Sequence, residues 1–163
     1  MKTNFSKKEL LTLIIASLIL GFVFGFDDKQ TVFEWSFWFS NYVLFFIISL
    51  IALTIFYIAE KKIAARYKTT SSFEIWNIRR LGFAEASRSK NPLYIGLFVP
   101  LFLTFLSNGI LPFTAVTQSS DETRSSHKLG KTYSRLSEFE LSRISIAGPF
   151  TLAIFAIIIK LMS

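Results

Sequence analysis

Four long apolar stretches alternate with polar segments along the chain, over residues 10–26, 37–59, 93–116 and 144–162. A helix of about 20 apolar residues crosses a bilayer, and the first, second and fourth stretches approach or exceed that length. The pattern predicts an all-α, multi-pass helical membrane protein with about four transmembrane or re-entrant helices. We place the second helix over 37–62 and the other three over the stretches themselves.

The third apolar stretch leaves two alternatives open. It is interrupted by Pro100, by Asn108 and Gly109, and by Pro112, so only residues 93–106 are cleanly apolar. As a helix, this shorter part spans about 21 Å. Either a kinked helix continues to residue 116, or the stretch is a re-entrant element sheltered by its neighbours, because unpaired backbone groups are not tolerated facing lipid.

Charge in the connecting segments predicts the orientation. Segment 60–91 contains eight Lys and Arg residues, residues 1–9 contain three Lys, and segment 27–36 is acidic. By the positive-inside rule, the N-terminus and segment 60–91 are cytoplasmic, and we expect the protein in the cell membrane. The polar segment 117–143 is external if the third stretch crosses completely and internal if it is re-entrant.

We expect a single membrane domain over residues 1–163. Its polar segments contain three local features. Polar and apolar residues alternate near 72–78, which favours a short interfacial strand. Residues 117–143 lack an apolar period and are predicted to form an exposed loop. Ser137 and Glu140 have capping-box spacing and predict a helix start before the last apolar stretch.

Composition excludes several classes of protein. Apolar residues make up 52% of the chain and charged residues 18%, against about 25% charge in soluble domains. With no Cys and one His, a single copy holds no disulfide, thiolate metal site or multi-histidine site, and we expect no cofactor. The net charge of +7 is concentrated beside the membrane segments, which argues for membrane orientation and against nucleic acid.

The expected partners are the lipid bilayer and either other membrane protein subunits or further copies of the chain. Aromatic and basic residues at the ends of the apolar stretches favour the headgroup level. The predicted membrane-interface residues are Trp35, Trp38, Lys61, Lys62, Arg79 and Arg80.

The order of several short motifs resembles the core of the site-2 proteases, which are intramembrane zinc metalloproteases, and of small archaeal members in particular. The resemblance covers roughly residues 44–163. Its first motif is the basic stretch 61–67 at the end of the second helix. Later motifs are Arg79-Arg80-Leu81-Gly82-Phe83 and Arg135-Leu136-Ser137-Glu138-Phe139-Glu140. The residues that we assign to family-like structural motifs are Phe73, Trp76, Ala147, Gly148 and Pro149.

The resemblance implies the fold and argues against the activity. The family uses His-Glu-x-x-His on the helix before the basic stretch, which aligns here with Phe56 to Glu60. Phe56 and Glu60 stand where the two His ligands belong, and Tyr57 where the general base belongs. The sole histidine is His127, and no Leu-Asp-Gly segment follows the final helix to supply the third ligand. We therefore assign no catalytic and no metal-binding residues.

These observations favour a catalytically inactive, site-2-protease-like membrane protein that acts as a scaffold or accessory subunit of a membrane complex. One alternative is a small structural subunit of a larger membrane complex unrelated to proteases. Another is an intramembrane metalloprotease that takes its ligands from another chain.

Overall fold

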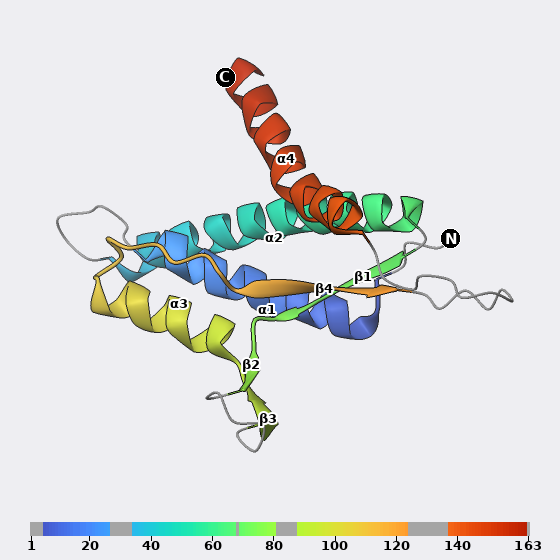
Figure 1. Ribbon diagram of the computed structural model, residues 1–163. Coiled ribbons are helices and arrows are strands. Elements are labelled where there is room, and N and C mark those ends of the chain that lie inside the picture. Colours follow the sequence, from blue (N-terminus) through green and yellow to red (C-terminus); the bar gives the residue numbers. More distant parts are fainter. Residues whose placement is uncertain (1–4, 27–33, 68, 81–87, 124–136, 163) are drawn as a thin grey trace, which may run out of the picture. The chain divides into compact units, whose positions relative to one another are not determined.

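The computed structural model describes residues 5–26, 34–67, 69–80, 88–123 and 137–162, most of them in four helices (Figure 1). Three of the helices, α1, α2 and α4, are long and apolar enough to cross a membrane. The chain is therefore predominantly helical, as predicted. In order, the elements are α1 (Lys7–Gly25), α2 (Trp35–Arg66), β1 (Thr69–Ile75), β2 (Ile78–Arg80), β3 (Arg88–Leu93), α3 (Ile95–Leu106), β4 (Thr117–Thr123) and α4 (Glu138–Met162).

Contacts group the chain into two compact units. The first, which we call the α4 unit, contains residues 1–6, 51–72 and 119–163. The second, which we call the α1 unit, contains residues 7–50 and 73–118. Helix α2 therefore contributes its N-terminal half to the α1 unit and its C-terminal half to the α4 unit. The expectation of a single domain stays a prediction.

In the α1 unit, α1 packs closely against the first half of α2 because two glycines leave room. A Cβ on Gly21 would lie 2.9 Å from the Cα of Phe46, and a Cβ on Gly25 would lie 3.0 Å from the Cα of Tyr42. Small residues permit this approach of two backbones. The later glycine meets the earlier residue of α2, so the two helices run antiparallel.

Helix α3 ends at Leu106, so the predicted helix over 93–116 is wrong beyond that residue. Asn108 and Gly109 have φ angles of 52° and 81°. This left-handed conformation cannot continue a right-handed helix, and Asn and Gly adopt it at low cost. The N–H of Gly109 donates to the carbonyl of Thr104 at 2.8 Å, which closes the turn. A kinked helix that continues to residue 116 therefore does not form.

The strands form two small sheets. In one, β1 pairs with β4, and in the other, β2 and β3 pair in antiparallel orientation. The strand predicted near 72–78 is present as β1, slightly earlier, and its Thr69, Ser71 and Phe73 are buried at alternate positions. The predicted loop over 117–143 is wrong at residues 117–123, which form β4. Backbone pairing with β1 forms this polar strand, so it lacks the apolar period that would reveal it in the sequence.

Helix α4 begins before the apolar stretch that predicted it. It starts at Glu138 instead of residue 144, and Pro149 lies inside it. The N–H of Glu140 donates to the hydroxyl of Ser137 at 3.3 Å, and the N–H of Ser137 donates to the carboxylate of Glu140 at 3.0 Å. These reciprocal bonds confirm the predicted capping box.

Candidate functional site

The residues that align with the zinc motif lie on α2 in the α4 unit, where α2 meets α4. A Cβ on Gly148 would lie 2.6 Å from Cε2 and 2.7 Å from Cδ2 of the Phe56 ring. The ring therefore rests on the backbone of α4, in space that any larger residue at position 148 would fill. The position that the resemblance assigns to a histidine ligand is occupied by a closely packed aromatic ring.

Three further residues of α2 form a buried face. Tyr57, Glu60 and Ala64 are 1%, 2% and 0% exposed, and their spacing places them on one side of the helix. The ring of Tyr57 meets the ring of Phe56 edge-on, with centroids 5.5 Å apart. A nearly inaccessible carboxyl group is uncommon because removing its charge from water is costly. Glu60 is therefore held inside the protein and takes part in its internal interactions.

Cations and aromatic rings gather at the C-terminal end of α2, which we call the basic–aromatic end. The ammonium group of Lys61 lies 4.5 Å from the centroid of the Phe5 ring. Across from it on α4, the guanidinium carbon of Arg143 lies 4.3 Å from the centroid of Phe139, and its Nη1 donates to the hydroxyl of Tyr67 at 3.3 Å. Contacts of this kind attract a cation to the face of an aromatic ring.

The opposite end of α2 contains the two predicted interface tryptophans. Trp35 is 75% exposed. The indole N–H of Trp38 donates to the carbonyl of Phe26 at 3.2 Å, and its ring stacks on Tyr42 with centroids 5.9 Å apart. The aromatic end of α2 is therefore bonded to the end of α1 within the α1 unit.

Two of the family-like structural residues lie in and beside β1. Phe73 is 2% exposed and belongs to the inner face of β1. The N–H of Trp76 donates to the carbonyl of Val116 at 2.9 Å, and the carbonyl of Trp76 accepts from the N–H of Gly96 at 2.9 Å. A Cβ on Gly96 would overlap the carbonyl oxygen of Val116. The backbone around Trp76 therefore joins the start of α3 to the chain that follows it.

The remaining predicted site residues are dispersed. Ala147 is half-buried beside Gly148, and Pro149 is exposed. Lys62 is exposed near the basic–aromatic end, whereas Arg79 and Arg80 belong to β2 in the α1 unit. Among these residues, Gly148 contacts Phe56 at the zinc-motif positions.

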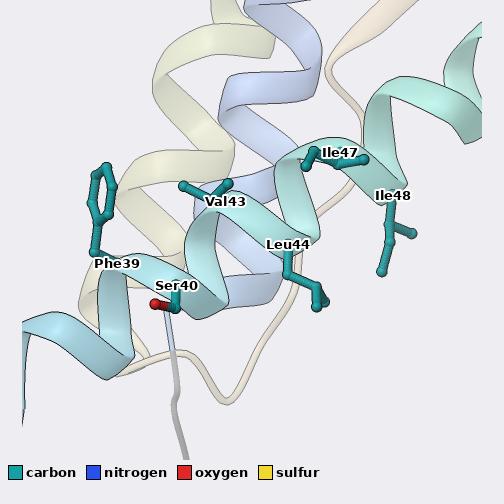
Figure 2. Close-up of a pocket in the computed structure, with 6 residues that line it drawn as sticks. All are labelled: Phe39, Ser40, Val43, Leu44, Ile47 and Ile48. Atoms are coloured by element: carbon teal, nitrogen blue, oxygen red, sulfur yellow. The ribbon is translucent and has the colours of Figure 1, made fainter.

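A shallow, open groove of about 590 Å³ lies over one face of the N-terminal half of α2, and Figure 2 shows the side chains that line it. The hydroxyl of Ser40 donates to the carbonyl of Ser36 in the same helix at 2.9 Å, so the groove presents an almost wholly apolar lining. Such a surface accommodates an acyl chain or an apolar side chain of another helix. Its lining residues are Phe39, Ser40, Val43, Leu44, Ile47 and Ile48.

Among the residues that the structure describes, no group of three or more His, Cys, Asp or Glu side chains could hold a metal ion. His127 lies outside the described residues. No family model, curated protein or solved structure matches this chain.

Sequence reasoning missed the cation–aromatic pairs of the basic–aromatic end. Phe139 and Arg143 are four residues apart, a spacing that places two side chains on one face of a helix, so this pair had a local signal. Phe5 and Lys61 are distant in sequence, and their contact had none. The groove on α2 was also missed, because its residues differ little in hydropathy from the rest of the helix.

Proposed function

We propose that this protein is a multi-pass integral membrane protein of the cell membrane that acts as a non-catalytic scaffold or accessory subunit. The observation that carries the proposal is the C-terminal part of α4. Residues 153–161 are all exposed, and all except Lys160 are apolar. Exposing such a surface to water is unfavourable by about 25 cal/mol per Å² of apolar area, whereas lipid or partner helices accommodate it.

The length of α2 supports the membrane location independently. Trp38 and Lys61 occupy opposite ends of its apolar part, and a rise of 1.5 Å per residue separates them by about 35 Å. This distance matches a hydrocarbon core of about 30 Å together with part of each headgroup region. Tryptophan and lysine are the residue types that favour those two boundaries.

The contacts at the zinc-motif positions support the non-catalytic part of the proposal. A phenyl ring has no atom that coordinates zinc, and Phe56 lies against Gly148. Tyr57 is 1% exposed, so its hydroxyl faces no open space in which a water molecule and a peptide bond could meet. On this basis the chain is proposed to be a degenerate relative of the site-2 proteases in which helix packing replaces zinc chemistry.

The scaffold role is supported by two apolar surfaces, the groove on α2 and the C-terminal part of α4. Ile47 and Ile48 in the groove are 49% and 51% exposed, and Ile157 on α4 is 58% exposed. Without a hydrophobic driving force between helices in lipid, association depends on shape and close packing. The exposed, bulky side chains on this face of α2 offer a partner helix a surface against which to pack.

Metal content and cleavage test the non-catalytic assignment. The protein purified from membranes in a mild detergent is expected to contain far less than one zinc per chain and to leave a transmembrane reporter peptide intact. An active intramembrane zinc protease, purified and assayed in parallel, serves as the positive control. One zinc per chain together with cleavage of the reporter would overturn the assignment.

Co-purification tests the scaffold assignment. We expect quantitative mass spectrometry to find a fixed set of membrane subunits with the wild-type chain. Ile47→Trp fills the groove and should reduce their recovery. The matched control Phe102→Trp adds bulk at a position on α3 that is 65% exposed and should leave recovery unchanged. Purification of the wild-type chain without any partner would contradict a scaffold role.

A further inference from the structure

The two ends of the polar segment between α2 and α4 lie beside one another in the α4 unit. Tyr67 directly follows α2, and its hydroxyl accepts a hydrogen bond from Arg143 in the second turn of α4. The chain therefore leaves α2 and enters α4 at the same place. Whatever the chain does between these residues, it returns to the side from which it started.

The beginning of helix α4 then runs back along α2. Arg143 contacts Tyr67, whereas the later residue Gly148 contacts the earlier residue Phe56. The order of these contacts is antiparallel. If α2 crosses the membrane toward the side of its basic end, α4 begins on that side and crosses in the opposite direction.

The α1 unit shows independently that the third apolar stretch turns back. Gly96, at the start of α3, and Val116, beyond its end, both bond to the backbone of Trp76. The left-handed turn at Asn108 and Gly109 separates the outgoing helix from the returning chain. After the return, β4 pairs with β1, and Figure 1 shows these two strands side by side. The start of the third apolar stretch and its end at Val116 therefore lie close together.

The distribution of Lys and Arg agrees with this path. If the chain returns, sixteen of the 18 Lys and Arg residues belong to segments on one side, and the two exceptions are Lys29 and Lys160. If the third stretch crossed completely, the five cations of segment 117–143 would join Lys29 on the opposite side. The returning path satisfies the positive-inside rule far better.

We propose that residues 69–123 form a re-entrant element, so that the chain crosses the membrane three times and its C-terminus lies opposite its N-terminus. The exposed cations of the basic–aromatic end, Lys62, Arg66 and Arg143, then form a basic surface that binds the anionic headgroups of the adjacent leaflet. This inference rests on the membrane location proposed above. It resolves the alternative that the sequence left open for the third stretch.

These cations of the basic–aromatic end are exposed on two neighbouring helices. Lys62 and Arg66 are exposed on α2, and Arg143 is exposed on α4 beside them. Among the acidic residues described in the α4 unit, Glu60 is buried, Glu140 is engaged in the capping box, and Glu138 is exposed in the first turn of α4. Exposed cations beside rings are therefore available to phosphate groups at the headgroup level.

Single cysteines test the path of the chain, because the protein has no Cys of its own. In intact cells, we expect Ser6→Cys and Ser142→Cys to be protected from a membrane-impermeant maleimide and to react after permeabilisation. Ser36→Cys and Ser163→Cys should react without permeabilisation. Reaction of Ser142→Cys together with Ser36→Cys, and protection of Ser163→Cys, would overturn the re-entrant path.

The same variants separate this inference from the proposed function. If all four cysteines react equally in intact cells, or if the chain remains in the soluble fraction, the membrane location itself fails. If instead the four cysteines divide into two pairs, the membrane location holds, and the identity of the pairs decides the path.

Lipid retention tests the basic surface. From nanodiscs of equal phosphatidylglycerol and phosphatidylcholine, the wild-type chain should retain phosphatidylglycerol preferentially in native mass spectrometry. Replacing Arg66 and Arg143 by Gln should reduce this preference about fivefold per cation. The control Lys160→Gln, which removes the isolated cation at the end of α4, should leave it unchanged. Equal retention of both lipids by the wild-type chain, or an equal loss in the control, would overturn headgroup binding.

Discussion

Helix α1 and the C-terminal part of α4 are both strongly apolar, but they have opposite surroundings within the chain. In the most apolar part of α1, 44% of the residues are buried by the protein, whereas in α4 the share is 11%. The packed face of α1 includes small residues, Ala16, Ser17 and Gly21, beside large ones such as Leu20. The exposed part of α4 is mostly bulky, as at Ile157.

This difference teaches that hydropathy alone does not tell a helix that packs against protein from one that faces lipid. Small residues allow neighbouring backbones to approach, and their hydroxyls bond within the helix, as the Ser17 hydroxyl does to the carbonyl of Leu13 at 2.8 Å. Large branched residues present area to lipid without such constraints. The small residues at a helix contact, such as Gly21 and Gly25, therefore carry information that hydropathy lacks.

The largest expected effect comes from filling the contact between α1 and α2. Gly21→Leu places a side chain where Phe46 backbone atoms lie about 3 Å away, and overpacking of this kind costs about 3 kcal/mol. Ala156→Leu adds the same bulk to the exposed part of α4 and should change stability little. Reversible unfolding in mixed micelles measures both variants. Equal stability of the two would contradict the contrast between the helices.

An intermediate effect is expected within α4 itself, which passes from a packed part to an exposed part. Gly148→Ala should destabilise the protein by about 2 kcal/mol because the Phe56 ring must move. Elsewhere in a helix, replacing Gly by Ala is favourable. Phe56→Leu should restore part of this loss in a double-mutant cycle. A coupling energy of zero between the two positions would show that the ring and the glycine are not in contact.

The smallest effect concerns a single hydrogen bond between helices. The side-chain amide of Asn41 donates to the carbonyl of Gly25 at 3.3 Å, and Asn41→Leu should cost about 0.6 kcal/mol, the average for such bonds in membranes. The hydroxyl of the neighbouring Ser40 donates to the carbonyl of Ser36 in its own helix and does not join two helices. Ser40→Ala should therefore leave the free energy of unfolding unchanged in the same assay, and a larger loss than for Asn41→Leu would reverse the assignment.

Much of the fold was predictable because long apolar stretches and capping residues act locally. Helices α1, α2 and α4 lie within several residues of their predicted bounds, and Ser137 with Glu140 forms the predicted cap. Strand β4 was not predictable from residues 117–123, because its partner β1 lies far away in the sequence. The end of α3 had a signal in Asn108 and Gly109, but only the observed φ angles distinguish a turn from a kink.

The candidate site was predictable in its chemistry and not in its contacts. The residue types at Phe56, Tyr57 and Glu60 are read from the sequence, and a phenyl ring at position 56 has no atom that ligates zinc. That the Phe56 ring lies on Gly148, and that Glu60 is only 2% exposed, depends on how α4 packs against α2. Residues so distant in sequence leave no periodic signal of their meeting.

The order of apolar stretches, the asymmetry of Lys and Arg and the lack of Cys were settled by the amino-acid sequence, because transfer free energies and residue chemistry belong to individual side chains. The proposal that the third apolar stretch turns back rests only on tertiary contacts, at Trp76 and at Tyr67. The path of the chain depends on contacts between residues that are distant in sequence. The free energy of those contacts comes from backbone hydrogen bonds and close packing between segments, which no single segment contains.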